Sequence, residues 1–477
     1  MSARAESIVR RPLPPLAWAV VGSAVALLLG AASAFSTKAA IAILVIVGVT
    51  VMAAIRPARI LGVLAISIFL ELLSVNGTTI SRLLAPITLV IVAVELIRGA
   101  TRVRSDRPLV WAVTYSLWAL ASGLWTVSLS GTVFQLGSLA IALVYMLAFA
   151  ALLQEERDLY PVLYLLAAAS LIVGVISTLS SSGRIHLGAA VQAGRGQGGV
   201  GDPDFFAAYQ LMVLPLLLVL ATRTTRSWLR GFVILAILAN IGSVLTSLSR
   251  GGFIALAFLL ILLLALPARW LFQTRARKVV AMIVVVAGTA VAGSHYSGSI
   301  LPRVTSIFAG SDSTNTSASN GSGRVELWNA AARSIGERPF LGLGYGGFAP
   351  RSNELLLSTP GVDLTNFPLR PTGLQTHNTY LGAWAELGLA GLVFYAGLLV
   401  STGALLRRTA VRAAQAGQEF VALISNALLL GLCTWAITSI FLSMETSRGF
   451  WIILGLALGL PKLLEEPAEP EPAEIAV

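Results

Sequence analysis

The chain has 477 residues, of which 56% are hydrophobic and only 12% are charged. A soluble domain of ordinary composition carries roughly 25% charged residues, so composition excludes that class. Uncharged apolar runs of about 20 residues match the ~30 Å hydrocarbon core of a bilayer. We therefore predict an all-α polytopic membrane protein, because helices satisfy their own backbone inside lipid. The net charge of +11 does not indicate nucleic-acid binding, since the basic residues lie in loops between apolar segments.

About fourteen segments, with a lower bound of twelve, are predicted to span the membrane. They begin near Leu16, Ala39, Ile60, Leu83, Leu109, Thr132, Tyr160, Phe205, Leu229, Gly251, Val279, Asn378, Phe420 and Gly449. Residues 1–14 form a basic N-terminus before a first span that we expect to be retained rather than cleaved. Residues 15–462 are expected to form one polytopic membrane domain. An acidic, Pro-rich disordered tail is expected over residues 463–477.

Basic residues divide unevenly between the two sets of loops. With the N-terminus inside and the spans alternating, 21 of the 33 Lys and Arg residues fall in inside segments, and only six in the short outer loops. Basic residues favour the cytoplasmic side. We therefore expect a multi-pass protein of the inner (plasma) membrane with both termini cytoplasmic. The long loop 296–376, with short helices of its own, is then periplasmic or extracellular.

The basic residues of the outer loops run against this bias and are the informative ones. Arg250 lies in the short turn SLSRGG between two strongly apolar segments, close to the depth of the lipid. An ionisable group at that depth is costly and is a functional candidate.

The polar, Gly-rich segment 180–204 contains Arg184, Arg195, Asp202 and Asp204. Glycines suit a close approach of the backbone to a ligand, and they equally suit a flexible turn. The letters DPD resemble the Asp-x-Asp of metal-dependent sugar transferases. Asp202 also fits the N-cap of a helix that starts at the following proline, and we favour the cap over a metal site.

Residues 310–323 are a low-complexity polar linker, and a helix is predicted to begin at Arg324. Helical spacing places Trp328 on the same, apolar face as Arg324, while Arg333 and Glu337 pair on the opposite face at i,i+4. Arg324 either stacks on Trp328 or points with the apolar face into a site that needs positive charge. We favour the second interpretation.

After the outer loop the chain re-enters the membrane at His377 and Asn378. The preceding GLGYGG, residues 342–347, lacks the strand and βαβ setting of a dinucleotide site, so we expect a tight turn. His377 stands at the expected water–lipid boundary, where an imidazole with a pKa near ~6.5 suits proton transfer at neutral pH. This favours a general base over a structural histidine. Glu386, inside the following span, is expected to pair with another polar group.

Four segments, in chain order, carry a resemblance to a known family: GDPDFFAAYQLMVLPL, SLSRGG, RVELWNAAARSIGERPFLGLGYGGF and HNTYLGAWAELGLAG. They resemble the bacterial O-antigen ligase and O-antigen polymerase family of membrane glycosyltransferases. The sequence departs from the family pattern at Asp202 and Asp204, where two asparagines are common. It also departs in its number of predicted spans, because the ligases usually have twelve.

The resemblance implies a GT-C-like fold and an enzyme without cofactor or metal. It implies inverting transfer of a glycan from an undecaprenyl-pyrophosphate donor to an acceptor hydroxyl on a glycan, a lipid or a protein. By the same resemblance, Arg250 and Arg324 would hold the donor pyrophosphate, and His377 would activate the acceptor hydroxyl. Further phosphate-binding candidates are Arg184 and Arg195. Possible supporting residues are Asn378, Trp328, Asp202, Asp204 and Glu386.

Three functions remain open from the sequence. The first is a ligase that joins a lipid-linked polysaccharide to an acceptor, and the second is a polymerase of repeat units with the same chemistry. The third is a polysaccharide or lipid transporter without catalysis. A transporter should show internal repeats and polar groups near the membrane midplane. We see no clear repeat, and the charges gather at the outer ends of the spans, which favours chemistry at the membrane surface.

Overall fold

A computed structural model of the chain describes residues 55–71, 74–75, 78–185, 194–295, 323–360 and 369–465. Several predictions fall outside these ranges and are not tested by them. They are the basic N-terminus, the spans that begin near Leu16 and Ala39, most of the 310–323 linker and most of the acidic tail.

The described chain is helical apart from one antiparallel pair of two-residue strands, β1 (Ser74–Val75) and β2 (Thr78–Thr79). The α-helices are α3 (Ile60–Ser67), α4 (Ile80–Ile97), α5 (Arg107–Ala121), α6 (Leu129–Leu152), α7 (Leu159–Ser181), α8 (Pro203–Arg223), α9 (Ser227–Thr246), α10 (Arg250–Ala265), α11 (Arg275–His295), α13 (Arg324–Glu337), α14 (Phe348–Ser358), α15 (Thr379–Gln415), α16 (Glu419–Thr438) and α17 (Arg448–Gly459).

Seven helices of the described residues are long and apolar enough to cross a membrane: α4, α6, α7, α8, α9, α15 and α16. The expectation of an all-α polytopic membrane protein is therefore confirmed. Every predicted span start that falls in the described ranges lies within four residues of a helix start. Several helices at the predicted span starts are short: α3 has 8 residues and α17 has 12, whereas a span needs ~20. The number of about fourteen spans stays a prediction.

Helix α8 is the centre of the bundle. Of its apolar 18-residue window 83% is buried inside the protein, compared with 28% for α15. A helix that is apolar on all sides is suited to such a position. Gly431 lets α16 approach α8 closely, because a Cβ there would lie only 2.7 Å from the carbonyl oxygen of Met212. Small residues at helix contacts serve this purpose inside membranes.

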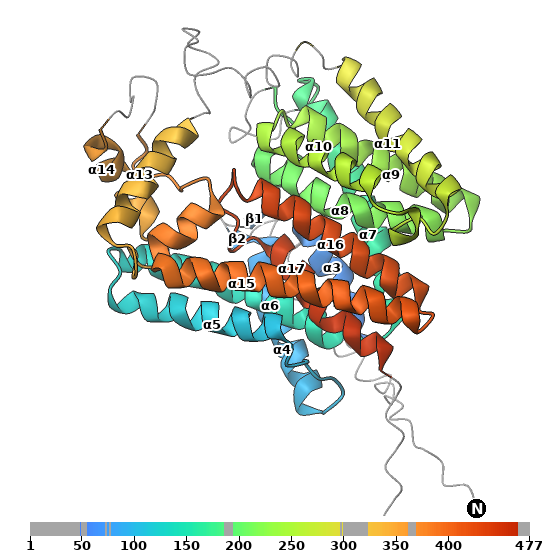
Figure 1. Cartoon of the computed structure of the whole chain (residues 1–477), viewed down its shortest axis with the longest axis horizontal. Helices are drawn as coiled ribbons and strands as arrows, with labels where there is room; N and C mark the ends of the chain where they lie inside the picture. The colour runs from blue at the N-terminus through green and yellow to red at the C-terminus, as the bar shows by residue number, and fades with distance from the viewer. Residues whose placement is uncertain are drawn as a thin grey trace, which may run out of the picture.

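The two ends of the bundle carry different sets of residues. At one end Arg223, which closes α8, pairs with Glu419 at the start of α16 over 3.1 Å, and Arg407 lies 4.8 Å from the ring of Trp270. At the other end α8 and α15 begin, and the short helices α13 and α14 of the long loop pack beside α15 (Figure 1). Residues predicted for one face of the membrane are thus gathered at one end. Which face each end occupies stays a prediction.

The glycine-rich loop 342–347 packs against a break in α15. Gly388 has φ 68° and ψ −171° inside this helix, and a Cβ there would lie 1.9 Å from the carbonyl oxygen of Phe340. The Gly344 N–H donates to the carbonyl oxygen of Glu386 at 2.8 Å. The loop is therefore the expected tight turn. The close neighbour of Gly388 is the backbone just before this loop.

Candidate functional site

A single carboxylate holds two of the predicted arginines. Asp204, in the first turn of α8, accepts a hydrogen bond from Arg195 Nη2 on its Oδ1 and one from Arg324 Nη2 on its Oδ2, both at 2.8 Å. The three side chains are only 12–17% exposed. Arg195 Nε also donates to the carbonyl oxygen of Ser247 at 2.8 Å, which fixes the guanidinium against the turn before α10. We call Arg195, Asp204 and Arg324 the arginine cluster.

Three helices begin around the arginine cluster. Arg324 is the first residue of α13, and Asp202 caps α8 by accepting from the N–H groups of Asp204 and Phe205 at 2.8 and 3.0 Å. Ser249 caps α10 through Gly252 N–H, and its hydroxyl also hydrogen-bonds to the Asp204 carboxylate. Helix N-termini have unpaired N–H donors and a partial positive charge. This end of the bundle is therefore suited to bind an anion.

The Asp202 carboxylate acts as the predicted helix cap. Burial, and then the nearby charge of Asp204, raise its pKa above the ordinary value. Within the described residues, no group of three or more His, Cys, Asp or Glu side chains is arranged to hold a metal ion.

The other two arginines predicted to bind phosphate take different positions. Arg250 is partly buried and begins α10, directly after Ser249, so its backbone adjoins the arginine cluster. Arg184 is exposed just beyond the end of α7. Among the contacts of the described chain, none joins Arg184 to Asp204. The structure thus brings the backbone positions of Arg195, Arg250 and Arg324 together at one end of the bundle and leaves Arg184 outside this group.

His377 stands beside the arginine cluster, just before α15. Its backbone is in the left-handed region, with φ 48°, and the following Asn378 caps α15 by accepting from two N–H groups at 3.0 Å. Burial, and then the nearby charge of Arg324, lower the pKa of His377 to about 4, although the charge of Asp204 opposes this shift. The expected pKa near 6.5 is therefore wrong, because it ignored burial and the nearby guanidinium. The imidazole is neutral at pH 7 and free to accept a proton.

Two of the predicted supporting residues have structural partners. Trp328, on α13, lies with its ring centroid 6.5 Å from that of Phe441, in the turn after α16. Glu386 accepts hydrogen bonds from the backbone N–H groups of Gly346 at 2.7 Å and Phe348 at 3.3 Å. The expected polar partner of Glu386 is thus the backbone of the glycine-rich loop rather than another side chain.

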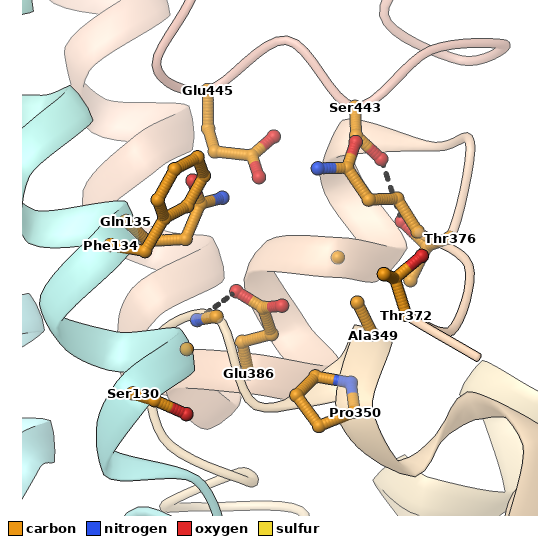
Figure 2. Close-up of a pocket in the computed structure, with 14 residues that line it drawn as sticks. Ser130, Phe134, Gln135, Ala349, Pro350, Thr372, Thr376, Glu386, Ser443 and Glu445 are labelled. Atoms are coloured by element: carbon orange, nitrogen blue, oxygen red, sulfur yellow. Dashed lines mark hydrogen bonds between the residues drawn. The ribbon is translucent and has the colours of Figure 1, made fainter. Parts of the chain in front are cut away.

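A cavity of about 420 Å³ opens next to this region. Thr376, the residue before His377, forms part of its wall, so the cavity begins one residue from the imidazole. Its other polar walls come from the start of α6, the glycine-rich loop, α15 and the turn between α16 and α17 (Figure 2). Polar wall residues include Gln135, Thr372, Thr376, Glu386, Ser443 and Glu445.

Sequence analysis missed Gln135 and Glu445 as site residues. Gln135 lies in an apolar helix, and Glu445 lies in a short turn without a recognisable motif. The one usable signal was a carboxylate in the turn between two apolar helices, where the cost of burying charge calls for a role.

Comparison with known families gives one match. Residues 232–396 match a family model described as O-antigen ligase. The matched residues include Arg250, Arg324 and His377 and exclude Arg195 and Asp204. No curated protein matches the chain.

Proposed function

We propose that this chain is a ligase. The premise is the match of residues 232–396 to the O-antigen ligase family, which makes the chain a membrane transferase of that family. It moves a glycan from an undecaprenyl-pyrophosphate donor to an acceptor hydroxyl, on the outer face of the inner membrane and without a metal. The family assignment itself covers lipid-linked glycan transfer of either the ligase or the polymerase type.

The arginine cluster is the observation that supports this proposal. A guanidinium has five N–H donors in a planar fork, and it matches phosphate oxygens while staying charged. Asp204 uses one terminal nitrogen of Arg324, which leaves further donors for a phosphate. The surrounding helix N-termini add positive potential. Together these groups suit a pyrophosphate, and Asp204 keeps the arginines in place before the donor binds.

In this proposal His377 is the general base. As the acceptor oxygen attacks the anomeric carbon of the donor sugar, His377 takes the proton from the acceptor hydroxyl. The bond between that carbon and the pyrophosphate oxygen breaks, and the pyrophosphate-linked lipid leaves as an anion. Arg324 and Arg250 stabilise the charge that develops on the leaving group. One displacement at the anomeric carbon inverts its configuration.

Deletion of the gene tests the ligase assignment. A ligase defect leaves polymeric glycan attached to its lipid carrier, because polymer forms but is not passed on. Single repeat units on the carrier would instead indicate a polymerase, and unchanged surface glycan would overturn the proposal. The same strain can report topology when it is complemented with the variant Arg370→Cys. Position 370 is exposed, so its cysteine should react with a membrane-impermeant thiol reagent in intact spheroplasts.

The pH dependence of transfer should reflect the depressed pKa of His377. A base whose pKa is about 4 is present in its active, neutral form above that pH and is lost as the pH falls through it. We therefore expect no loss of rate from His377 between pH 8 and pH 5, and a decline centred near pH 4. The measurement is kcat/KM for the donor at subsaturating acceptor, since this quantity reports groups of the free enzyme.

This pH experiment needs two controls. Burial also raises the pKa of Glu445 to about 7, so Glu445→Gln is measured in parallel to identify any limb from that carboxyl. Activity must return when acid-treated protein is brought back to pH 7. A limb centred near pH 6.5 that persists in Glu445→Gln would contradict a buried, neutral His377.

Removing the carboxylate of Asp204 should impair the enzyme by releasing both arginines. Hydrogen bonds to charged groups contribute about 1.5–3 kcal/mol, so Asp204→Ala is expected to lower kcat/KM by about 10- to 100-fold. Asp204→Asn keeps an oxygen acceptor and should lose less. Glu337→Gln is a matched control, because its ion pair with Arg333 is exposed and such pairs contribute little. An Asp204→Ala enzyme within twofold of the wild type would refute this role.

A further inference from the structure

The cavity beside His377 contains two buried carboxylates with different surroundings. Both oxygens of Glu386 accept from backbone N–H groups, at 2.7 Å from Gly346 of the glycine-rich loop and at 3.3 Å from Phe348, the first residue of α14. Glu445 is only 6% exposed, and its Oε2 has no hydrogen-bond partner among the described residues. Figure 2 shows the Glu445 carboxylate directed toward the cavity, across from Glu386. Because an unsatisfied buried acceptor is costly, a ligand that donates a hydrogen bond to Glu445 would be stabilised in the cavity.

Glu445 is held in this position by its backbone. The indole Nε1 of the fully buried Trp451 donates to the Glu445 carbonyl oxygen at 2.9 Å. The turn beside it is tied to the chain before α15, where the Thr376 and Ser443 hydroxyls hydrogen-bond at 3.2 Å. The carboxylate therefore faces a preformed cavity rather than a surface that must be ordered by the ligand.

The chemistry of the walls narrows the choice of ligand. Two carboxylates disfavour a phosphate, which has its own site at the arginine cluster. The remaining polar groups are neutral hydroxyls and the amides of Gln135 and Gln375, and Phe134 adds an aromatic ring at the wall. Amide and hydroxyl groups with one carboxylate acceptor suit the hydroxyls of a sugar, and an aromatic ring suits its apolar face. The volume of about 420 Å³ lies in the ~300–1,000 Å³ range of small-molecule pockets.

We propose that this cavity is a subsite for one sugar unit of the glycans being joined, in which Glu445 accepts a hydrogen bond from a sugar hydroxyl. The inference rests on the proposed glycan transfer. Thr376 forms part of the cavity wall and precedes His377, so a sugar bound there lies next to the base. The pyrophosphate stays at the arginine cluster, and the two sites divide the substrate between sugar and phosphate recognition.

Sugar binding is tested directly on the full-length protein in lipid nanodiscs. One probe is the glycan released by mild acid from the cell's own lipid-linked donor. The other is the deacylated carbohydrate of the acceptor fraction, purified from a strain that lacks the gene. Binding is followed as the shift in thermal unfolding with probe concentration. We expect Glu445→Ala to weaken the binding of one probe by at least about tenfold, and the probe that loses affinity identifies donor or acceptor sugar.

Two further variants serve as an independent test and as a control. Gln135→Ala removes a wall residue from a different helix, α6, and should weaken the same probe even if a Glu445 variant fails to fold. Glu354→Gln is the matched control, since that carboxylate is exposed on α14 and pairs with Arg351. It should bind both probes as the wild type does.

Failure of the subsite and failure of the proposed function give different results. If wild-type protein transfers glycan while Glu445→Ala and Gln135→Ala bind and transfer normally, the subsite is overturned and the function stands. If the wild type transfers nothing from the lipid-linked donor yet binds sugar through Glu445, the transferase proposal fails and the subsite stands.

Discussion

Replacing His377 by alanine is expected to reduce kcat for glycan transfer by about 10²- to 10⁴-fold, the usual contribution of a positioned general base. The imidazole is neutral at pH 7 because burial and Arg324 lower its pKa to about 4. It also has Thr376, a wall residue of the sugar-sized cavity, as its neighbour. The measurement is single-turnover transfer from a radiolabelled lipid-linked glycan by protein in nanodiscs.

The backbone of His377 determines which control variant is informative. With φ 48°, the position costs an alanine some strain, whereas asparagine visits this region more readily. His377→Asn therefore removes the base and keeps the local backbone, so it should be as inactive as His377→Ala. Both proteins should retain the wild-type affinity for the donor. If either variant transfers glycan at more than a tenth of the wild-type rate, His377 is not the base.

Local patterns predicted the parts of this site that depend on one helix. The spacing of apolar residues placed Arg324 on the packed face of its helix, and Leu327, Ala331 and Ser334 of α13 are buried while Val325 is 50% exposed. The ion pair between Arg333 and Glu337 is also present, at 3.2 Å. Helical periodicity is a local property, and this explains why these predictions were confirmed.

The features that sequence patterns missed depend on contacts between distant segments. Asp204 and Arg324 are 120 positions apart, and no local spacing indicates that they meet. The same holds for the cavity, whose walls come from α6, α14, α15 and three connecting segments. The pKa expected for His377 was wrong for the same reason, since the actual value depends on burial and on the charge of the distant Arg324. Sequence analysis therefore found the chemical groups, whereas their arrangement depends on long-range contacts such as the ion pair that joins Arg324 of α13 to Asp204 of α8.

Replacement of Arg324 by alanine should lower kcat/KM by about 10²- to 10³-fold, as expected when one donor to a developing negative charge is lost. Arg324→Lys should recover only part of the activity. Lysine has a single charged centre, whereas the planar fork of arginine can donate to Asp204 and to a phosphate at once. The measurement is the separate determination of kcat and of the KM for the donor.

The separate effects of the substitution on kcat and on the KM for the donor test what Arg324 does. If the guanidinium stabilises the leaving pyrophosphate, kcat falls together with kcat/KM; if it only binds the donor, KM rises and kcat is unchanged. Arg333→Ala is the matched control, because Arg333 lies on the exposed face of the same helix and pairs with Glu337. It should remain within twofold of the wild type. An Arg324→Ala enzyme as active as this control would remove α13 from the mechanism, and the anion would then have to bind at Arg195 and Arg250 alone.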